Sequence, residues 1–401
     1  MPPETIRVAA DQEDDRYSRL RLIPWWDQER IRATNVLVVG AGALGNEILK
    51  NLALLGFLRV VVIDLDHIEL SNLSRSILFR AADVGKSKAE AVASAYRDVL
   101  PEATVVPMVA NVMRDVGLGL FSWADIVLGG LDNREARLWI NRAAWKTNRP
   151  WIDGAIEGIN GVARVFLPGQ PPCYECTLGE TDWAILDRRM SCNLLLHEPN
   201  PQGRVPTTPT ISSIIAGIEV QEAVKLLHGL PSLAGKGYVF EGLHHTSYVT
   251  EYTENRDCMS HYVLDEAIQL PERSSELTLG DLYRRACSDL HCDAVEIDFS
   301  RDIIQKLVCP VCDDEEECYL PVGAVSFAQG PCPKDGNMRI VKTLSGFRGE
   351  PELAGRMLDK LGLPLWDIFT ARSNDEEKSY CVAGDSVAVL GPLAAAAEVL
   401  A

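Results

Sequence analysis

Three glycines at fixed spacing constrain the fold of this chain more than any other feature. Gly40, Gly42 and Gly45 form a G-x-G-x-x-G motif between an apolar strand-like segment, 35–39, and a segment with helical apolar spacing, 44–55. Glycines here permit a tight turn and let phosphate groups approach the backbone at a helix N-terminus. The motif alone predicts a nucleotide site, an NAD site included, and a tight turn without a ligand is the plain alternative.

The segments around this motif alternate between strand-like and helix-like patterns. Predicted strands lie at 35–39, 59–63, 103–109 and 124–129, and predicted helices at 44–55, 87–100 and 133–147. This alternation predicts a Rossmann-like, doubly wound α/β fold with a mostly parallel sheet. Prolines then predict an extended crossing segment at about 168–210 that holds one short helix near 183–189. A long helix, 211–228, and strands at 237–253 are expected to close this part of the chain.

The pattern changes after about residue 262. A short helix is predicted at 277–290, an acidic run follows at 313–317, and the chain ends in an Ala-rich helical stretch. We expect two domains, 1–262 and 263–401, of which the second is a smaller α+β domain. An apolar fraction of 47% is enough to give both a packed core.

Charge and hydropathy exclude two classes of partner. The net charge of -18 disfavours binding to nucleic-acid backbones. No apolar run reaches the roughly 18 residues that a membrane helix needs, and residues 1–15 lack the pattern of a signal peptide. We therefore expect a cytoplasmic protein. Its eleven cysteines then favour metal binding over disulfides.

The residues after the glycine motif argue against NAD. Asp64 stands at the end of the next strand, where a carboxylate holds ribose hydroxyls. Asp66, Asn72, Arg75 and Lys88 follow, and a dehydrogenase needs no such set, whereas a triphosphate does because Arg and Lys neutralise phosphate oxygens.

Another pair of polar residues follows a later strand. Asp132 and Asn133 come after the strand at 124–129, and the Asp132 carboxylate is a suitable ligand for Mg²⁺. ATP with Mg²⁺ is therefore the expected cofactor.

Together these motifs resemble the family of ThiF, MoeB and the ubiquitin-activating enzymes over roughly residues 15–262. The matching pieces are Tyr17-Ser18-Arg19, the glycine motif, Asp64, Asp66, Asn72, Arg75, Lys88, Asp132, Asn133 and the helical motif around Gly217, Glu219 and Glu222. The resemblance implies that Asp64 binds ribose, that Asn72, Arg75 and Lys88 contact the triphosphate, and that Asp132 positions magnesium. It also implies a homodimer in which Arg19 reaches the phosphates of the second copy; a surface arginine is the alternative.

Two cysteine pairs have the spacing of zinc ligands. Cys173 and Cys176 form C-x-x-C, and Cys258 and His261 form C-x-x-H, where relatives have a second C-x-x-C. Three thiolates and one imidazole make a closed, structural zinc site that would hold the crossing segment against the end of the domain.

A second zinc site is a further hypothesis. It would use Cys309, Cys312 and Cys332, with either Cys318 or Asp335 as the fourth ligand, and buried free cysteines are the alternative.

One cysteine of the crossing segment belongs to neither metal set. Cys192 follows Arg188 and Arg189, whose charges favour a thiolate. Thioester-forming relatives carry their catalytic cysteine in a comparable place, and an incidental loop cysteine is the alternative.

The resemblance implies ATP-dependent adenylation of the C-terminal carboxylate of a ubiquitin-like protein. A thioester on Cys192 and transfer to a conjugating enzyme, recruited by residues 263–401, would follow. The chain looks most like the activating enzymes of bacterial ubiquitin-like conjugation operons, the BilD-like group, which would place it in antiviral defence. Adenylation of a sulfur carrier for thiocarboxylate formation is the first alternative. A catalytically inactive scaffold is disfavoured because Arg75, Lys88 and Asp132 are all present.

Overall fold

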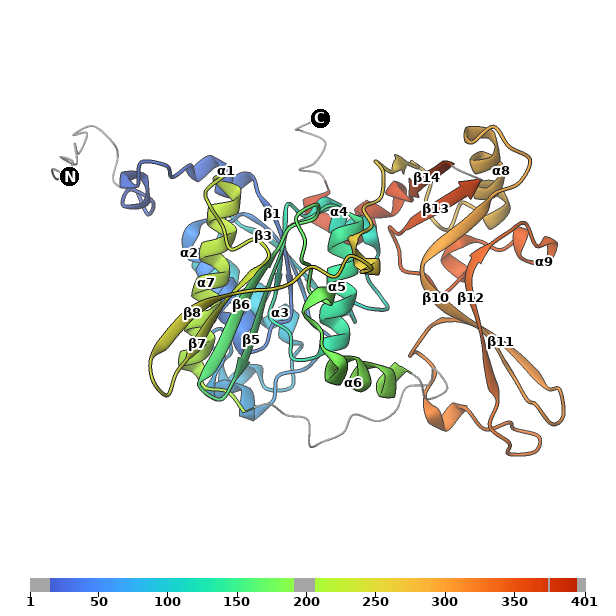
Figure 1. Cartoon of the computed structure of the whole chain (residues 1–401), viewed down its shortest axis with the longest axis horizontal. Coiled ribbons are helices and arrows are strands. Elements are labelled where there is room, and N and C mark those ends of the chain that lie inside the picture. The colour runs from blue at the N-terminus through green and yellow to red at the C-terminus, as the bar shows by residue number, and fades with distance from the viewer. Residues whose placement is uncertain (1–14, 191–205, 374–375, 395–401) are drawn as a thin grey trace.

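The computed structural model describes residues 15–190, 206–373 and 376–394 and shows two units, each built on its own sheet (Figure 1). The first unit has an eight-stranded sheet and the second a six-stranded one. The predicted α/β fold with a smaller second unit is confirmed. Within these ranges no helix combines the length and the apolar character that a membrane span requires.

The first sheet is parallel on one side and antiparallel on the other. Its strands are β1 (Asn35–Val39), β2 (Arg59–Ile63), β3 (Thr104–Met108), β4 (Ile126–Gly129), β5 (Trp151–Glu157), β6 (Asn160–Phe166), β7 (Lys236–Glu241) and β8 (Thr246–Glu251). They lie in the order β3-β2-β1-β4-β5-β6-β7-β8, parallel from β3 to β5 and antiparallel from there on. The β5–β6 hairpin has no predicted counterpart because glycines at 154, 158 and 161 interrupt its apolar pattern.

Helices cover both faces of this sheet. They are α1 (Gln28–Ala33), α2 (Ala43–Leu55), α3 (Lys88–Val99), α4 (Leu118–Trp123), α5 (Arg134–Lys146), α6 (Glu180–Met190) and α7 (Pro209–Leu227). In Figure 1, α2 and α7 lie on one side of the strands and α4 and α5 on the other. Buried residues of α2, α3 and α7 form one apolar core with the sheet, and those of α4 and α5 form another. Only α1 and α4 lack a predicted counterpart, because each has just six residues, fewer than two turns.

The second unit is a sheet with short helices around it. Its strands are β9 (Ile268–Gln269), β10 (Glu296–Val308), β11 (Glu315–Pro321), β12 (Ile340–Phe347), β13 (Ile368–Ser373) and β14 (Glu376–Cys381), and its helices are α8 (Leu279–Asp289), α9 (Pro351–Ala354) and α10 (Ser386–Leu390). The strand order is β11-β10-β13-β14-β9, and β12 also pairs with β10. The predicted boundary at residue 262 falls shortly before β9.

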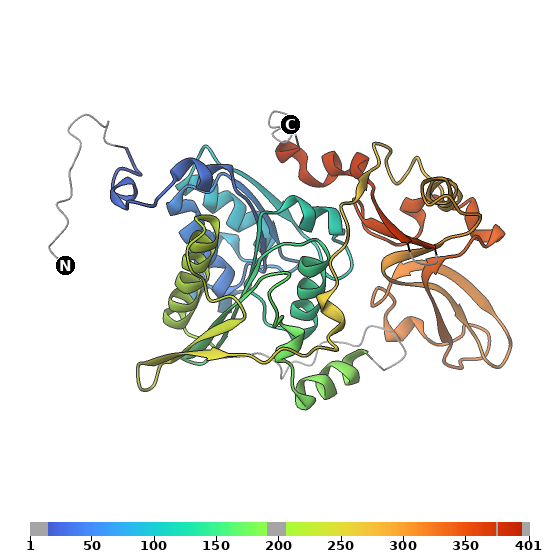
Figure 2. The ribbon, with the colours of Figure 1, turned by 45° about the horizontal axis from the view of Figure 1, so that its top comes forward.

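The two units lie side by side (Figure 2), and they share part of an apolar core. Trp366, Ile368 and Leu390 lie in the same apolar cluster as the helix α4 and the strand β1. The guanidinium of Arg301 lies 4.4 Å from the ring centre of Trp139 in α5 and donates to the carbonyls of residues 113 and 116. The second unit therefore packs on the same face of the first sheet as α4 and α5 and extends the apolar core there.

Candidate active site

The carboxyl ends of three parallel strands meet at the point where the strand order reverses. Val39, the last residue of β1, pairs with Ile63 of β2 on one side and with Gly129 of β4 on the other. The chain leaves β1 for α2 on one face of the sheet and leaves β4 for α5 on the other face, so a crevice opens between β1 and β4. Ligands of open α/β sheets bind in this crevice.

The glycine motif forms the turn from β1 into α2. Gly40 has a φ of +95°, and a Cβ there would meet the carbonyl oxygen of Gly130 at 2.4 Å. A Cβ on Gly45 would lie 1.9 Å from the carbonyl oxygen of Gly40, whereas one on Gly42 would meet nothing within 4 Å. Gly40 and Gly45 are thus required by the packing of the loop itself, and Gly42, the N-cap of α2, borders open space. A phosphate at the α2 N-terminus fits this space.

Asp64 fixes the loop from the end of β2. Its carboxylate accepts the backbone N–H of Ala41 at 2.7 Å and that of Asp66 at 2.8 Å. Burial raises the pKa of Asp64 and the nearby Lys88 ammonium opposes that shift. The carboxylate therefore stands directly beside the glycine motif, as a ribose-binding group must.

The cationic residues follow on the next loop. Lys88, at the start of α3, forms an ion pair of 2.7 Å with Asp66, and the Lys88 side chain is only 13% exposed. Arg75 ends the short 3-10 helix Leu70–Ser74 and donates to the carbonyl of Ser71 at 3.1 Å. The Asn72 side chain accepts the N–H of Glu69 at 2.9 Å and so shapes this turn. Arg75 and Lys88 both carry the charge that phosphate oxygens require.

Asp132 and Asn133 have different surroundings. Asp132 is exposed at the loop after β4, where it can reach a hydrated Mg²⁺. The side-chain oxygen of Asn133 caps α5 by accepting the N–H of Ala136 at 2.8 Å, and its amide nitrogen donates to Asp132 at 3.3 Å. Asn133 thus orients Asp132 and begins α5, a structural role beside the predicted binding role.

A buried charge cluster behind the crevice has no counterpart in the sequence analysis. Asp153 of β5 is fully buried and accepts from Arg137 at 2.9 Å and from Arg164. Arg137 also donates to the carbonyl of Leu131, the residue before Asp132. The cluster therefore holds the loop that carries Asp132. Arg137 lies four residues after Asn133. Residues four apart lie on the same face of a helix, so this spacing could have indicated that Arg137 lies near the loop of Asp132.

Glu219 of α7 adds a fourth buried charge-bearing group. Neither of its oxygens has a hydrogen-bond partner, and a Cβ on Gly154 would lie 2.4 Å from one of them. Burial, and secondarily the charge of Asp153, raise the pKa of Glu219 well above its ordinary value. Both effects favour the protonated, neutral form of the Glu219 carboxyl group.

One predicted catalytic residue, Arg19, lies away from the crevice. Arg19 is exposed on the N-terminal arm, whose Tyr17 packs against Gly56 at the far end of α2. That end is about 20 Å from the glycine loop at 1.5 Å per residue, so Arg19 is not in the crevice of its own chain. Cys192 lies outside the described residues.

The first set of predicted zinc ligands is brought together. The ligand atoms of Cys173, Cys176, Cys258 and His261 all lie within 4.8 Å of one another. The Sγ atom of Cys173 is 3.8 Å from that of Cys176 and 3.6 Å from that of Cys258. Tetrahedral Zn²⁺ with bonds of about 2.3 Å separates two thiolates by roughly 3.8 Å, so the donor set fits zinc.

The surroundings of this cluster explain its position. The ring of His261 stacks on Trp145 of α5 at 4.6 Å, and burial lowers the pKa of His261, which favours the neutral, metal-binding imidazole. Arg142 of α5 forms two hydrogen bonds of 3.0 Å with Glu175, between the two cysteines of the C-x-x-C pair. The cluster thus ties the crossing segment to α5, more than two helical turns from Asp132, which suits a structural role.

The other predicted metal residues gather in the second unit. Cys309, Cys312 and Cys332 form a group with Asp335, and Cys318 is outside it.

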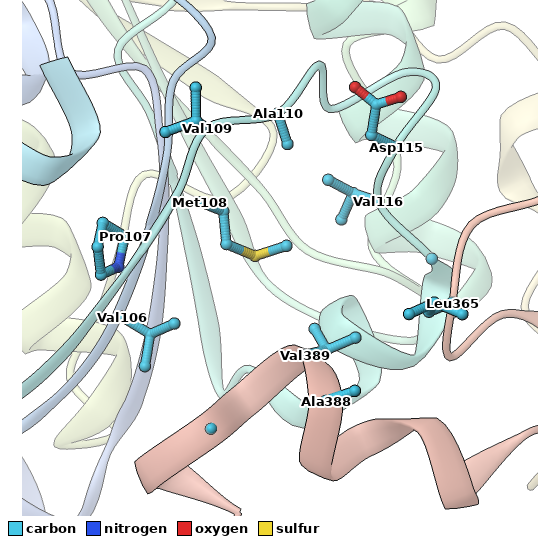
Figure 3. A pocket seen from close by; sticks show the side chains of 12 residues that line it. Val106, Pro107, Met108, Val109, Ala110, Asp115, Val116, Leu365, Ala388 and Val389 are labelled. Atoms are coloured by element: carbon cyan, nitrogen blue, oxygen red, sulfur yellow. The ribbon is translucent and has the colours of Figure 1, made fainter. Parts of the chain in front are cut away.

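A cavity of about 400 Å³ lies between the two units, and none of the residues of the two cysteine clusters lines it (Figure 3). Side chains of Val106 and Met108 from β3 line it, with Ala388 and Val389 of α10. Its one carboxylate, Asp115, accepts the N–H of Asn111 at 2.8 Å and thereby closes a turn. Apart from Asp115, the side chains that line the cavity are apolar among the residues that the structure describes.

The fold and the crevice define a nucleotide-binding α/β protein of the adenylating type. The model of the ThiF family matches residues 15–260, more than half of the chain, and the chain belongs to this family.

The proteins to which the chain is similar include subunits of NEDD8- and SUMO-activating enzymes. The NEDD8-activating enzyme E1 catalytic subunit of Arabidopsis thaliana is 42% identical over 156 residues, which are 36% of this chain and 34% of that protein. The SUMO-activating enzyme subunit uba-2 of Caenorhabditis elegans is 40% identical over 157 residues, 38% of this chain and 27% of that protein. The chain therefore spans about a third of these relatives' length. The crystal structure of E. coli MccB with ATP has a TM-score of 0.52 at 22% identity and covers 63% of this chain and 75% of that one, which supports the fold.

Proposed function

We propose that this chain uses ATP and Mg²⁺ to adenylate the C-terminal carboxylate of a ubiquitin-like protein. The observation that carries the proposal is the open N-terminus of α2 at Gly42, with Asp64 beside it and the Lys88 ammonium next to Asp66. Membership of the ThiF family supports it, as does the likeness to NEDD8- and SUMO-activating subunits.

The reaction needs positioning and charge neutralisation more than acid–base catalysis. A carboxylate oxygen of the partner attacks the α-phosphorus of ATP, a new P–O bond forms, and the bond to the β-phosphate oxygen breaks. Pyrophosphate leaves with that electron pair, and an acyl-adenylate remains. Because the carboxylate is already ionised, no protein base is required. Arg75 and Lys88 would neutralise phosphate oxygens, and Asp132 would hold Mg²⁺, which supplies further neutralisation.

The second step assigns Cys192 as the nucleophile. Its thiolate attacks the acyl carbon, a C–S bond forms, and the C–O bond to AMP breaks, so that AMP leaves with the electron pair. The thioester then passes to the cysteine of a conjugating enzyme, and the second unit would recruit that enzyme. This pathway is of the kind found in bacterial ubiquitin-like conjugation operons.

The proposed active form is a homodimer. Arg19 is about a helix length from its own glycine loop, as estimated from the rise of α2, so its expected role at the phosphates requires a second copy. The protein would work in the cytoplasm, where ATP and the partner are present.

The test combines pyrophosphate exchange with non-reducing gels. The full-length chain is incubated with ATP, Mg²⁺ and ubiquitin-like proteins, as wild type, Cys192→Ala and the control Cys318→Ala. Partner-dependent exchange is expected in all three. A thiol-sensitive adduct is expected in wild type and in Cys318→Ala only.

Two outcomes would revise the proposal. Exchange without an adduct in any form would remove Cys192 as nucleophile and favour adenylation of a sulfur carrier. Absence of partner-dependent exchange with every ubiquitin-like or sulfur-carrier protein tried would overturn the adenylation itself.

A further inference from the structure

A tight turn at the tip of the second sheet presents two cysteines. Cys309 and Cys312 follow β10 in the sequence Cys-Pro-Val-Cys. The N–H of Cys309 donates to the carbonyl of Asp314 at 2.8 Å, and the N–H of Asp313 donates to the carbonyl of Cys309 at 3.1 Å. Asp313, the fifth residue of the turn, has a φ of +54°.

A second turn before β12 repeats this geometry. In the sequence Cys-Pro-Lys-Asp, the N–H of Cys332 donates to the carbonyl of Asn337 at 2.7 Å, and the N–H of Gly336 donates to the carbonyl of Cys332 at 2.9 Å. Gly336, again the fifth residue, has a φ of +76°. Each turn therefore offers a ligand at its first and fourth positions, and Asp335 stands where the first turn has its second cysteine.

The two turns bring their ligand atoms together. The Sγ atom of Cys312 lies 3.7 Å from that of Cys332, and the Sγ atom of Cys309 lies 3.4 Å from a carboxylate oxygen of Asp335. All four ligand atoms are within 4.8 Å of one another. These separations approach the roughly 3.8 Å edge of a zinc–thiolate tetrahedron.

We propose that Cys309, Cys312, Cys332 and Asp335 bind one Zn²⁺ ion. Three soft thiolates select zinc over magnesium or calcium, and the carboxylate completes a four-coordinate site. Backbone groups support the ligands, since the N–H of Lys334 donates to the Cys332 sulfur at 3.4 Å.

The site stabilises a part of the chain that has little apolar core. Only Ile304, Leu307 and Val325 are fully buried in the apolar cluster of this tip. Small structures with so few buried apolar side chains commonly gain stability from a metal ion or a disulfide. The ion would connect the β10–β11 hairpin to the loop before β12, and so hold residues 304–341 in one arrangement.

The first experiment measures zinc in the purified full chain by mass spectrometry. If both metal groups bind zinc, wild type contains two ions per chain, Cys312→Ser contains one, and the matched control Cys318→Ser contains two. Equal zinc in wild type and Cys312→Ser would overturn the proposal, as would a disulfide between Cys312 and Cys332 in the freshly purified protein.

A second variant keeps the test independent of misfolding. Asp335→Cys retains four ligands, so it is expected to keep its zinc, to release it to a chelator more slowly, and to strengthen the thiolate charge-transfer band after exchange with Co²⁺. Asp313→Asn, in the adjacent turn, is the control and should match wild type. Chelation should open residues 304–341 to a protease while 35–166 stay resistant. An unchanged cobalt band in Asp335→Cys would contradict the assignment of the fourth ligand.

Discussion

Two glycine-to-alanine substitutions in the same loop are expected to affect different properties. Gly42→Ala should weaken ATP binding, and Gly45→Ala should lower the free energy of unfolding. A Cβ on Gly42 meets nothing within 4 Å, and its φ of -71° suits alanine. Alanine is a weaker N-cap than glycine by about 0.5–1 kcal/mol, and the lower entropy of the unfolded chain offsets roughly the same amount. The free energy of unfolding of Gly42→Ala should therefore stay within about 1 kcal/mol of wild type.

Gly45→Ala is expected to destabilise the fold. Its Cβ would lie 1.9 Å from the carbonyl oxygen of Gly40, so the loop and the helix must separate. Overpacking of this kind destabilises by about 3 kcal/mol, and the better helix propensity of alanine returns about 1 kcal/mol. Urea unfolding should show a net loss of about 2 kcal/mol.

The nucleotide affinities separate the two effects. In Gly42→Ala the new methyl group occupies the space where phosphate would contact the backbone, and loss of one charge-assisted hydrogen bond, about 1.5–3 kcal/mol, weakens ATP binding about ten- to hundredfold. Titration calorimetry with ATP and Mg²⁺ measures this loss. Wild-type affinity in a stable Gly42→Ala protein would refute the placement of the phosphates at this loop.

Further predictions concern charged residues. Lys88→Ala should lower partner-dependent pyrophosphate exchange about a hundredfold, whereas Lys86→Ala, which removes an exposed partner of Asp83, should leave it unchanged; equal losses would contradict the assigned role. Asp153→Asn should reduce the free energy of unfolding by about 3 kcal/mol because two buried guanidinium groups lose their counter-charge, and a loss below 1 kcal/mol in urea unfolding would count against the cluster. Burial raises the pKa of Glu219 above its ordinary 4.5, so the native state keeps a proton that the unfolded chain releases. Wild-type stability should accordingly fall relative to Glu219→Gln as pH rises above 4.5, and parallel stability–pH curves would show that Glu219 ionises normally.

The nucleotide crevice could be predicted because its parts are local in sequence. Gly40, Gly42 and Gly45 follow a strand directly, Asp64 follows the next, and Asp132 follows a third. In a parallel sheet, carboxyl ends of neighbouring strands meet at one edge, so order along the chain predicts proximity in space.

The buried cluster of Arg137, Asp153, Arg164 and Glu219 could not be predicted in this way. Its members come from α5, β5, β6 and α7, and the antiparallel hairpin that brings two of them together has a weak, glycine-interrupted pattern. Only packing shows that these charges are inside the protein and that Arg137 holds the carbonyl of Leu131.

The two cysteine clusters were likewise predicted in part from the sequence and decided in part by the structure. Spacing indicated both cysteine sets because two ligands on one tight turn must be two or three residues apart, but the choice between Cys318 and Asp335 depended on how two distant turns face each other.

The sequence by itself determined the parallel sheet, the glycine loop and the residues at the strand ends, because each depends on short-range periodicity or turn chemistry. The tertiary structure alone decided that the second unit completes a core of the first, that Arg19 lies at the far end of α2, and which carboxylate joins the second set of cysteines. Those features arise from contacts between segments far apart in the chain, and such contacts are set by side-chain packing, which leaves no periodic trace in the sequence.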